Sequence, residues 1–93
     1  MTIQADASRT LGYQQFTPAA STALTVPAGT SYAIITPLTQ GIRWRDDGTA
    51  PTAAIGYPLA AGSELRYNGA NLANLRIIQQ AASAEVNVMY YGN

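Results

Sequence analysis

The residues best suited to chemistry lie in one segment, Arg43–Thr52, with the sequence Arg-Trp-Arg-Asp-Asp-Gly-Thr-Ala-Pro-Thr. Asp46 and Asp47 before Gly48 match the start of a calcium loop, which needs several oxygen ligands and a closing glutamate. No further carboxylate follows before Glu64, so the pattern is incomplete. A turn with glycine at positive φ explains the Asp-Gly pair without a metal. We therefore predict no metal site.

Catalysis is poorly supported by the composition. The chain has no histidine, cysteine or lysine, which removes the usual general base and the soft metal ligands. Without such a base its serines cannot be activated as nucleophiles. A carboxylate pair could perform glycoside hydrolysis, but 93 residues leave little room for a cleft that raises the pKa of one carboxyl group. We predict that the protein is not an enzyme and binds no cofactor.

Trp44 lies between Arg43 and Arg45, and two interpretations of this triplet compete. The side chains could stack on and pair with a nucleic acid or an acidic sugar. Alternation along a strand instead favours Trp44 in the core, with the arginines bonded to acidic residues on neighbouring strands or subunits. The net charge of zero and the lack of a basic run argue against a nucleic-acid partner.

The overall composition suggests a surface covered by other protein. Hydrophobic residues make up 47% of the chain and charged residues only 11%, against roughly 25% charged in a typical soluble domain. A chain with few charges and no net charge is expected to contact a partner or copies of itself. No apolar stretch approaches the roughly 18 residues of a membrane span, and the N-terminus lacks the pattern of a signal peptide. We expect synthesis in the cytoplasm and no membrane partner.

Glycine and proline recur between short runs rich in Thr, Val, Ile and Tyr, which is typical of an all-β protein. The single helical candidate is one turn within Ala70–Leu75. Residues 1–11 are polar and without periodicity, so we predict an N-terminal arm followed by one domain at residues 12–93. The expected strands are Gly12–Thr17, Ala23–Val26, Ser31–Leu38, Gly41–Asp46, Gly56–Leu59, Ser63–Tyr67, Leu75–Gln80 and Glu85–Tyr91.

Period-two alternation along these strands indicates a sheet with one apolar and one polar face. Ile42 and Trp44 oppose the two arginines beside them, and Leu65 and Tyr67 oppose Glu64 and Arg66. Because an apolar sheet face must be covered, about seven or eight such strands predict a small antiparallel β-sandwich or flattened barrel, jelly-roll-like in architecture. In the last strand, Val86, Val88 and Tyr90 oppose Glu85, Asn87, Met89 and Tyr91, so Tyr91 is expected to face outward.

The order of several motifs resembles small structural proteins of tailed bacteriophages and prophages. These motifs are Val26-Pro27-Ala28-Gly29, then Ile42-x-Trp44-Arg45-x-Asp47-Gly48-x-x-Pro51-Thr52-x-x-x-Gly56-x-x-Leu59-x-x-Gly62, and finally Leu75-Arg76-Ile77-Ile78 with Val86-Asn87-Val88-x-Tyr90-Tyr91. The resemblance covers about residues 22 to 91. It implies a virion structural protein and supplies no catalytic residue.

Within that class we expect a capsid decoration or cement protein that binds the outer shell and stabilises contacts between capsomers. The expected partners are the major capsid protein or other virion proteins, and copies of the chain itself, with a trimer as the expected oligomer. A neck, tail or fibre component and a small carbohydrate-binding module using Trp44 stay open as alternatives. The candidate protein-contact residues are Arg43, Arg45, Arg66, Arg76 and Tyr91.

Overall fold

A computed structural model describes residues 9–68 and 71–92 of the chain. Within these ranges it contains eight strands and one short 3-10 helix, and no helix is long and apolar enough to cross a membrane. The all-β prediction and the single helical turn are therefore confirmed. The elements are β1 (Arg9–Phe16), β2 (Thr22–Ala23), β3 (Thr30–Pro37), β4 (Ile42–Arg45), β5 (Tyr57–Leu59), β6 (Leu65–Tyr67), η2 (Leu72–Asn74), β7 (Arg76–Gln79) and β8 (Val86–Gly92).

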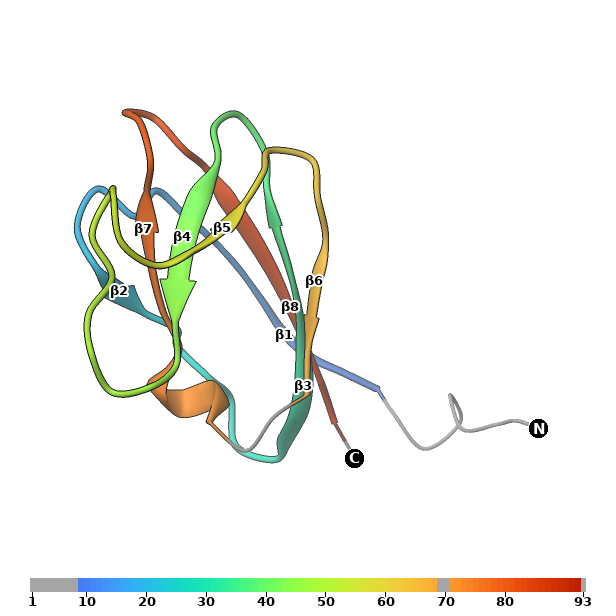
Figure 1. The fold of residues 1–93 in the computed structure, drawn as a ribbon. Coiled ribbons are helices and arrows are strands. Elements are labelled where there is room, and N and C mark those ends of the chain that lie inside the picture. Colours follow the sequence, from blue (N-terminus) through green and yellow to red (C-terminus); the bar gives the residue numbers. More distant parts are fainter. Residues whose placement is uncertain (1–8, 69–70, 93) are drawn as a thin grey trace.

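The strands form two four-stranded antiparallel sheets that lie face to face (Figure 1). Sheet A has the order β1-β8-β3-β6 and sheet B the order β2-β7-β4-β5. The first strand pairs with the last, the second with the seventh, the third with the sixth and the fourth with the fifth. This nested pairing, rolled into two layers by the β3–β8 and β4–β7 contacts, is the strand order of a jelly roll. The jelly-roll-like expectation is confirmed.

The core lies between the sheets and follows the predicted alternation. In β8, Val86, Val88 and Tyr90 are buried while the residues between them are half-buried on the outer side. Trp44 is half-buried and packs against the core, as predicted. The buried hydrophobic residues are Leu24, Ala33, Ile35, Ile42, Tyr67, Leu72, Leu75, Ile77, Ala84, Val86, Val88 and Tyr90.

The first strand begins earlier than the sequence indicated. Residues 9–11, assigned above to the arm, belong to β1, where Arg9 pairs with Gly92 and Thr10 with Tyr91. The pairing register shifts between Thr10 and Gly12, and such a bulge disrupts the period-two pattern that identifies a strand from sequence. The rest of the predicted arm, residues 1–8, lies outside the described residues.

Candidate functional site

The outer surface of sheet A carries a cluster of large side chains that we call the aromatic face. Paired residues of neighbouring strands share one face of a sheet, and the register places Tyr13, Met89, Ile34 and Arg66 side by side across all four strands. Tyr91 and Tyr32 form a second row beside the first. The aromatic face therefore consists of Tyr13, Tyr32, Ile34, Arg66, Met89 and Tyr91.

A stack of two rings and one guanidinium forms part of the aromatic face. The rings of Tyr32 and Tyr91 are nearly parallel, with 5.0 Å between their centroids and 12° between their planes. The guanidinium carbon of Arg66 lies 4.9 Å from the centroid of the Tyr32 ring, within the range of a cation–π contact. Arg66 makes no ion pair with any described residue. Its N–H groups therefore stay available to an outside acceptor.

Tyr13 marks the edge of the same face. Its side chain is 56% exposed, and its hydroxyl donates to Oδ1 of Asn87 at 2.6 Å. This bond holds the ring over β8, so the phenol contributes a fixed apolar surface beside Met89. Tyr13 and Tyr32 were not among the predicted contact residues. The alternation of Tyr32 with buried Ala33 and Ile35 was the signal available for finding the second of them.

The outer surface of sheet B differs, since it carries three arginines and no aromatic stack. Arg43 donates from Nε to the carbonyl oxygen of Ala53 at 3.0 Å and from Nη1 to that of Gly56 at 2.8 Å. Gly56 has a φ of +146°, and a Cβ there would lie 3.0 Å from Cβ of Arg43 and 3.1 Å from Cβ of Pro51. Only glycine permits this close approach. Arg43 therefore ties the loop between β4 and β5 to the sheet.

The other two arginines of sheet B are direct neighbours. Arg45 pairs with Arg76 across the strands, a like-charge arrangement that is unfavourable by itself. Arg45 also forms an ion pair with Asp47, with 2.6 Å between Nη2 and Oδ2. The hydrogen bond from Arg45 lowers the pKa of Asp47 to about 2. Arg76 is exposed and has no ion-pair partner among the described residues.

We call Arg43, Arg45 and Arg76 the arginine face. The structure thus divides the five predicted contact residues between two opposite surfaces. Arg66 and Tyr91 come together on the aromatic face, while the other three lie on the arginine face. On the arginine face, two of the three guanidinium groups are already bound within the chain. The acceptors of Arg43 are backbone carbonyls, where the sequence analysis expected acidic side chains.

A hollow of about 270 Å³ lies beside Trp44 and is lined by Trp44, Arg45, Asp46, Asp47, Gly56 and Tyr57. The rings of Trp44 and Tyr57 lie 5.5 Å apart with their planes tilted by 44°, and Tyr57 is 67% exposed. The Trp44 indole N–H is buried without a partner among the described residues. The aromatic surface that the hollow offers to a ligand is therefore mainly that of Tyr57.

Asp46, which lines this hollow, takes part in a hydrogen bond that joins the two sheets. The hydroxyl of Tyr67 in β6 donates to Oδ2 of Asp46, which follows β4, at 2.5 Å. Burial and this bond raise the pKa of Tyr67 to about 12. Gly48 in the following turn has a φ of +88°, as predicted from the Asp-Gly pair. Within the part of the chain that the structure describes, no group of three or more metal-ligating side chains occurs.

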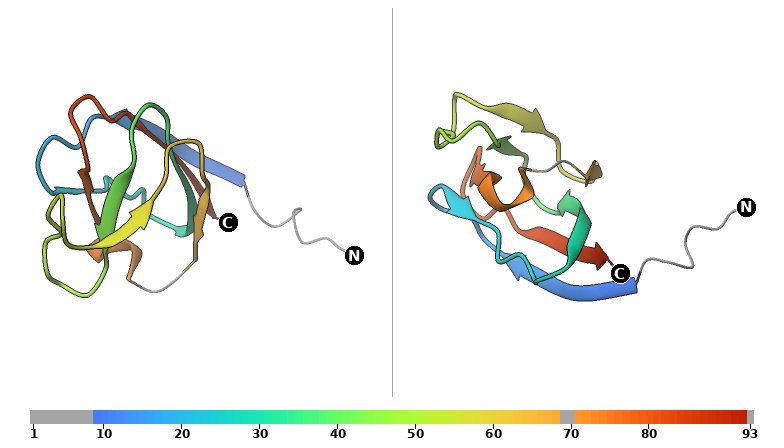
Figure 2. Two further views of the ribbon diagram at one scale, coloured as in Figure 1. Left: turned by 45° about the horizontal axis from the view of Figure 1, so that its top comes forward. Right: turned by 90° about the horizontal axis from the view of Figure 1, so that it is seen from below.

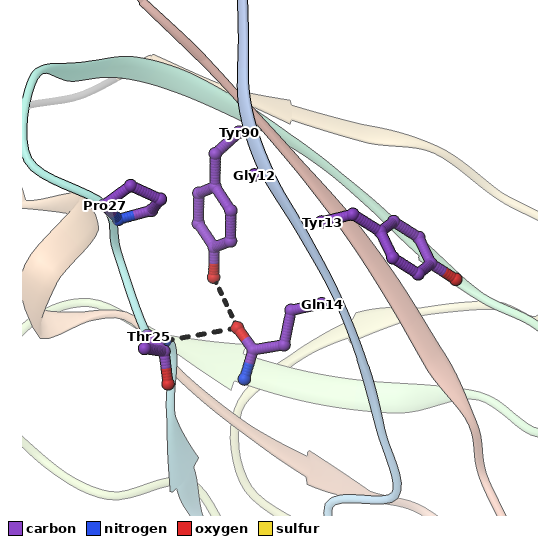
Figure 3. Close-up of a pocket in the computed structure, with 6 residues that line it drawn as sticks. All are labelled: Gly12, Tyr13, Gln14, Thr25, Pro27 and Tyr90. Atoms are coloured by element: carbon purple, nitrogen blue, oxygen red, sulfur yellow. Dashed lines mark hydrogen bonds between the residues drawn. The ribbon is translucent and has the colours of Figure 1, made fainter.

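A second hollow, of about 380 Å³, opens between β1 and the segment that leads into β3 (Figure 3). Gln14 points into it, and its Oε1 accepts from the Tyr90 hydroxyl at 2.6 Å and from the Thr25 N–H at 3.2 Å. Pro27 lies across from Gly12, while Tyr13 points away on the other side of the strand. Burial raises the pKa of Tyr90 to about 12. These bonds fix β1 to the rest of the sandwich.

Comparison of the chain with protein-family models, with curated proteins and with solved structures gave no match.

Proposed function

We propose that this protein is a structural protein of a tailed-bacteriophage particle. More specifically, it is a capsid decoration protein that binds the outer shell, stabilises contacts between capsomers and performs no catalysis. The observation that carries the proposal is the jelly-roll strand order of the two sheets, an architecture used by viral shell domains and by lectins. One architecture serves several functions, so the motif resemblance and the surfaces supply the rest of the support.

The aromatic face is the surface that we assign to the shell. Tyrosine and arginine are enriched in protein interfaces, and this face presents the stacked Tyr32 and Tyr91 beside an Arg66 that has no ion pair among the described residues. A stacked pair loses little side-chain freedom on binding, because its rotamers are already restricted. The low charge of the chain fits attachment through shape and apolar contact.

The partners in this proposal are the major capsid protein and copies of the chain itself, and the location is the virion after synthesis in the host cytoplasm. A position in the neck, tail or fibre would use the same fold at low copy number. The copy number therefore separates the two locations.

The test is quantitative mass spectrometry of purified particles, with the major capsid protein as the internal reference. A molar ratio near one, or near one oligomer per few capsomers, is expected for a decoration protein. A few to a few dozen copies would move the protein to the neck, tail or fibre. Absence from the particle would refute the virion assignment.

The hollow beside Trp44 favours a second candidate function, binding of a neutral sugar. Exposed Tyr57 can stack on a sugar ring, and Asp46, Asp47 and Arg45 lie around it as hydrogen-bonding groups. Because Trp44 is the single tryptophan of the chain, its fluorescence reports directly on this hollow. A saturable change on titration with mono- and oligosaccharides, abolished in Tyr57→Ala, would support the sugar site. A flat titration would eliminate it.

A further inference from the structure

The four edge strands of the sandwich differ sharply in length. β2 at one edge of sheet B has two residues, and β6 at one edge of sheet A has three. β5 also has three residues and contains Pro58, which cannot donate to a neighbouring strand. β1 is eight residues long and has no proline. Long, uncharged edges are templates for pairing with another strand, so β1 stands apart from the other three.

The backbone groups on the open side of β1 can be assigned from one hydrogen bond. Leu38 donates to the carbonyl oxygen of Glu85 at 2.7 Å, so Glu85 points toward the β3 side of β8. In an antiparallel sheet successive residues point their N–H and C=O groups to alternate sides. Val86, Val88 and Tyr90 therefore point toward β1.

The pairing of β1 with β8 shows which β1 residues point their backbone groups toward β8. Gly12, Gln14 and Phe16 are the partners of those three β8 residues, so their backbone groups bond to β8. Tyr13 and Gln15 consequently point their N–H and C=O groups away from the sheet. Neither residue has another backbone partner among the described residues. Within the described ranges, two N–H donors and two C=O acceptors on this edge are thus left unpaired.

We propose that the free edge of β1 pairs with β1 of a second copy of this chain, antiparallel about a two-fold axis through Gln14. In this register Tyr13 lies opposite Gln15 of the second copy, and Gln15 opposite its Tyr13. All the outward N–H and C=O groups of both residues are then bonded, as a closely spaced pair on each side of the axis. The result is one continuous sheet made from the two copies of sheet A.

A second copy fits this edge because the edge is self-complementary. The regular stretch from Gly12 to Phe16 is centred on Gln14, and no residue from Thr10 to Phe16 is charged. Arg9 lies beyond the bulge, so the two-fold axis places the two Arg9 residues at opposite ends of the interface. With zero net charge, two copies do not repel one another. The pairing closes after two copies, and the trimer expected above would need a different surface.

The pairing would also place both aromatic faces on the same side. The two-fold axis through a pair of adjacent antiparallel strands is perpendicular to the sheet, so the outer surfaces of both sheets A face one way. A dimer would then dock on a repeating surface through two linked sites, which raises the overall affinity. The inference itself rests on the edge geometry and holds whatever surface the protein binds.

The test is the mass of the full chain in solution, measured by sedimentation equilibrium over a series of concentrations. A mass approaching twice the 9.8 kDa of one chain is expected for the wild type. Gln15→Pro removes an outward N–H without removing a bond to β8 and is expected to be monomeric. Gln15→Thr is the matched control, since it removes the same side chain but keeps the N–H, and it should stay dimeric. Circular dichroism establishes that both variants are folded.

A cross-link tests the register and does not depend on the folding of the proline variant. The chain has no cysteine, so Gln14→Cys introduces a single thiol opposite that of the second copy, in a non-hydrogen-bonded pair where Cβ atoms are close enough for a disulfide. The substitution removes the bonds of Gln14 to Tyr90 and Thr25, so circular dichroism must establish that this variant is folded. Mild oxidation is expected to give a covalent dimer, whereas Ala82→Cys in the exposed β7–β8 turn should stay largely monomeric. A wild type that is monomeric at every concentration, a folded Gln15→Pro that stays dimeric, or equal cross-linking by both cysteines would each overturn the proposal.

Discussion

The two outer surfaces of this sandwich use arginine in opposite ways. On the arginine face, Arg43 is bonded to two carbonyl oxygens of the β4–β5 loop, and Arg45 is paired with Asp47. On the aromatic face, Arg66 lies over the Tyr32 ring and has no ion pair among the described residues. Two of the three guanidinium groups on the arginine face therefore bind other parts of the same chain. On the other surface, the Arg66 guanidinium has no carboxylate partner among the described residues.

This difference follows from the architecture of the sheets. Three of the four strands of sheet A are long, with seven or eight residues each in β1, β3 and β8 (Figure 2). Sheet B has strands of two to four residues, so its β4–β5 loop needs a side chain to fix it. We therefore expect substitutions on the arginine face to change stability, and substitutions on the aromatic face to change binding.

The largest effect on stability is expected from Arg43→Ala. The change removes two charge-assisted hydrogen bonds and leaves the carbonyls of Ala53 and Gly56 without this partner. A loss of about 2 kcal/mol in the free energy of unfolding is expected, because a hydrogen bond to a charged group is worth roughly 1.5–3 kcal/mol and only the bond to Gly56 is part-buried, while the bond to Ala53 is exposed. Urea unfolding followed by Trp44 fluorescence measures it.

Arg76→Ala is the matched control for that experiment, because Arg76 belongs to the same face. A change within about 0.5 kcal/mol is expected, as for other exposed side chains without specific partners. Because the substitution also removes the unfavourable contact with Arg45, the free energy of unfolding should increase slightly, if it changes at all. Equal losses in both variants would contradict the specific role of Arg43.

The next largest effect is expected from Tyr67→Phe, which removes the bond to Asp46 that joins the two sheets. The loss should be about 1.5 kcal/mol, since the acceptor is a charged carboxylate. Equilibrium unfolding at neutral pH measures this loss. Tyr13→Phe removes a hydroxyl that is bonded only at the surface and serves as the control, with a smaller expected change.

Alkaline pH should lower the stability of the protein through the hydroxyls of Tyr67 and Tyr90. The pKa of Tyr67 and that of Tyr90 are raised to about 12 from the ordinary value of 10, so the folded protein disfavours the phenolates more than the unfolded chain does. The stability due to these groups is fully present below pH 10 and is lost as the pH rises through 12. Unfolding measured over this range should show a shallower loss in Tyr67→Phe than in the wild type. Identical curves would contradict the account.

Substitutions on the aromatic face should lower the free energy of unfolding less than Arg43→Ala does. Arg66→Ala is expected to lower the free energy of unfolding by about 0.5 kcal/mol, the value of an exposed cation–π contact. Thermal unfolding monitored by circular dichroism is a sufficient measurement. A loss as large as that of Arg43→Ala would remove the distinction between the two faces.

The smallest effect concerns Asp47 at acid pH. Its pKa is lowered from 3.8 to about 2, chiefly by the hydrogen bond from Arg45. The corresponding stability is present above pH 3.8 and is lost as the pH falls through 2. Asp47→Asn should lack this component of the acid dependence in urea unfolding. Because the pair is exposed, the difference between the two curves should be small.

Much of the fold could be predicted because it follows from local pattern. Seven of the eight strands, the single helical turn and the outward position of Tyr91 follow from turn residues and alternation. The predicted strand Ala23–Val26 shares only Ala23 with β2. The start of β1 could not be predicted, because the bulge near Leu11 interrupts the alternation. One extra residue in a bulge is thus enough to remove the period-two pattern by which a strand is recognised in a sequence.

The surfaces were harder to predict, because they depend on register. The stack of Tyr32 on Tyr91 brings together residues 59 positions apart, and no local pattern fixes which residues lie opposite one another. The same holds for the meeting of Arg45 and Arg76 across two strands. The carbonyl partners of Arg43 depend on the path of a loop, which side-chain types alone do not determine.

The most direct test of the proposed capsid-decoration function is binding of the purified protein to phage particles assembled without it. Tyr91→Ala is compared with Arg76→Ala, and bound protein is quantified by mass spectrometry. The account predicts at least a roughly 30-fold weaker binding for Tyr91→Ala, as for an interface hot spot, and nearly unchanged binding for Arg76→Ala. Loss of binding in Arg76→Ala with retention in Tyr91→Ala would assign docking to the arginine face and contradict the account.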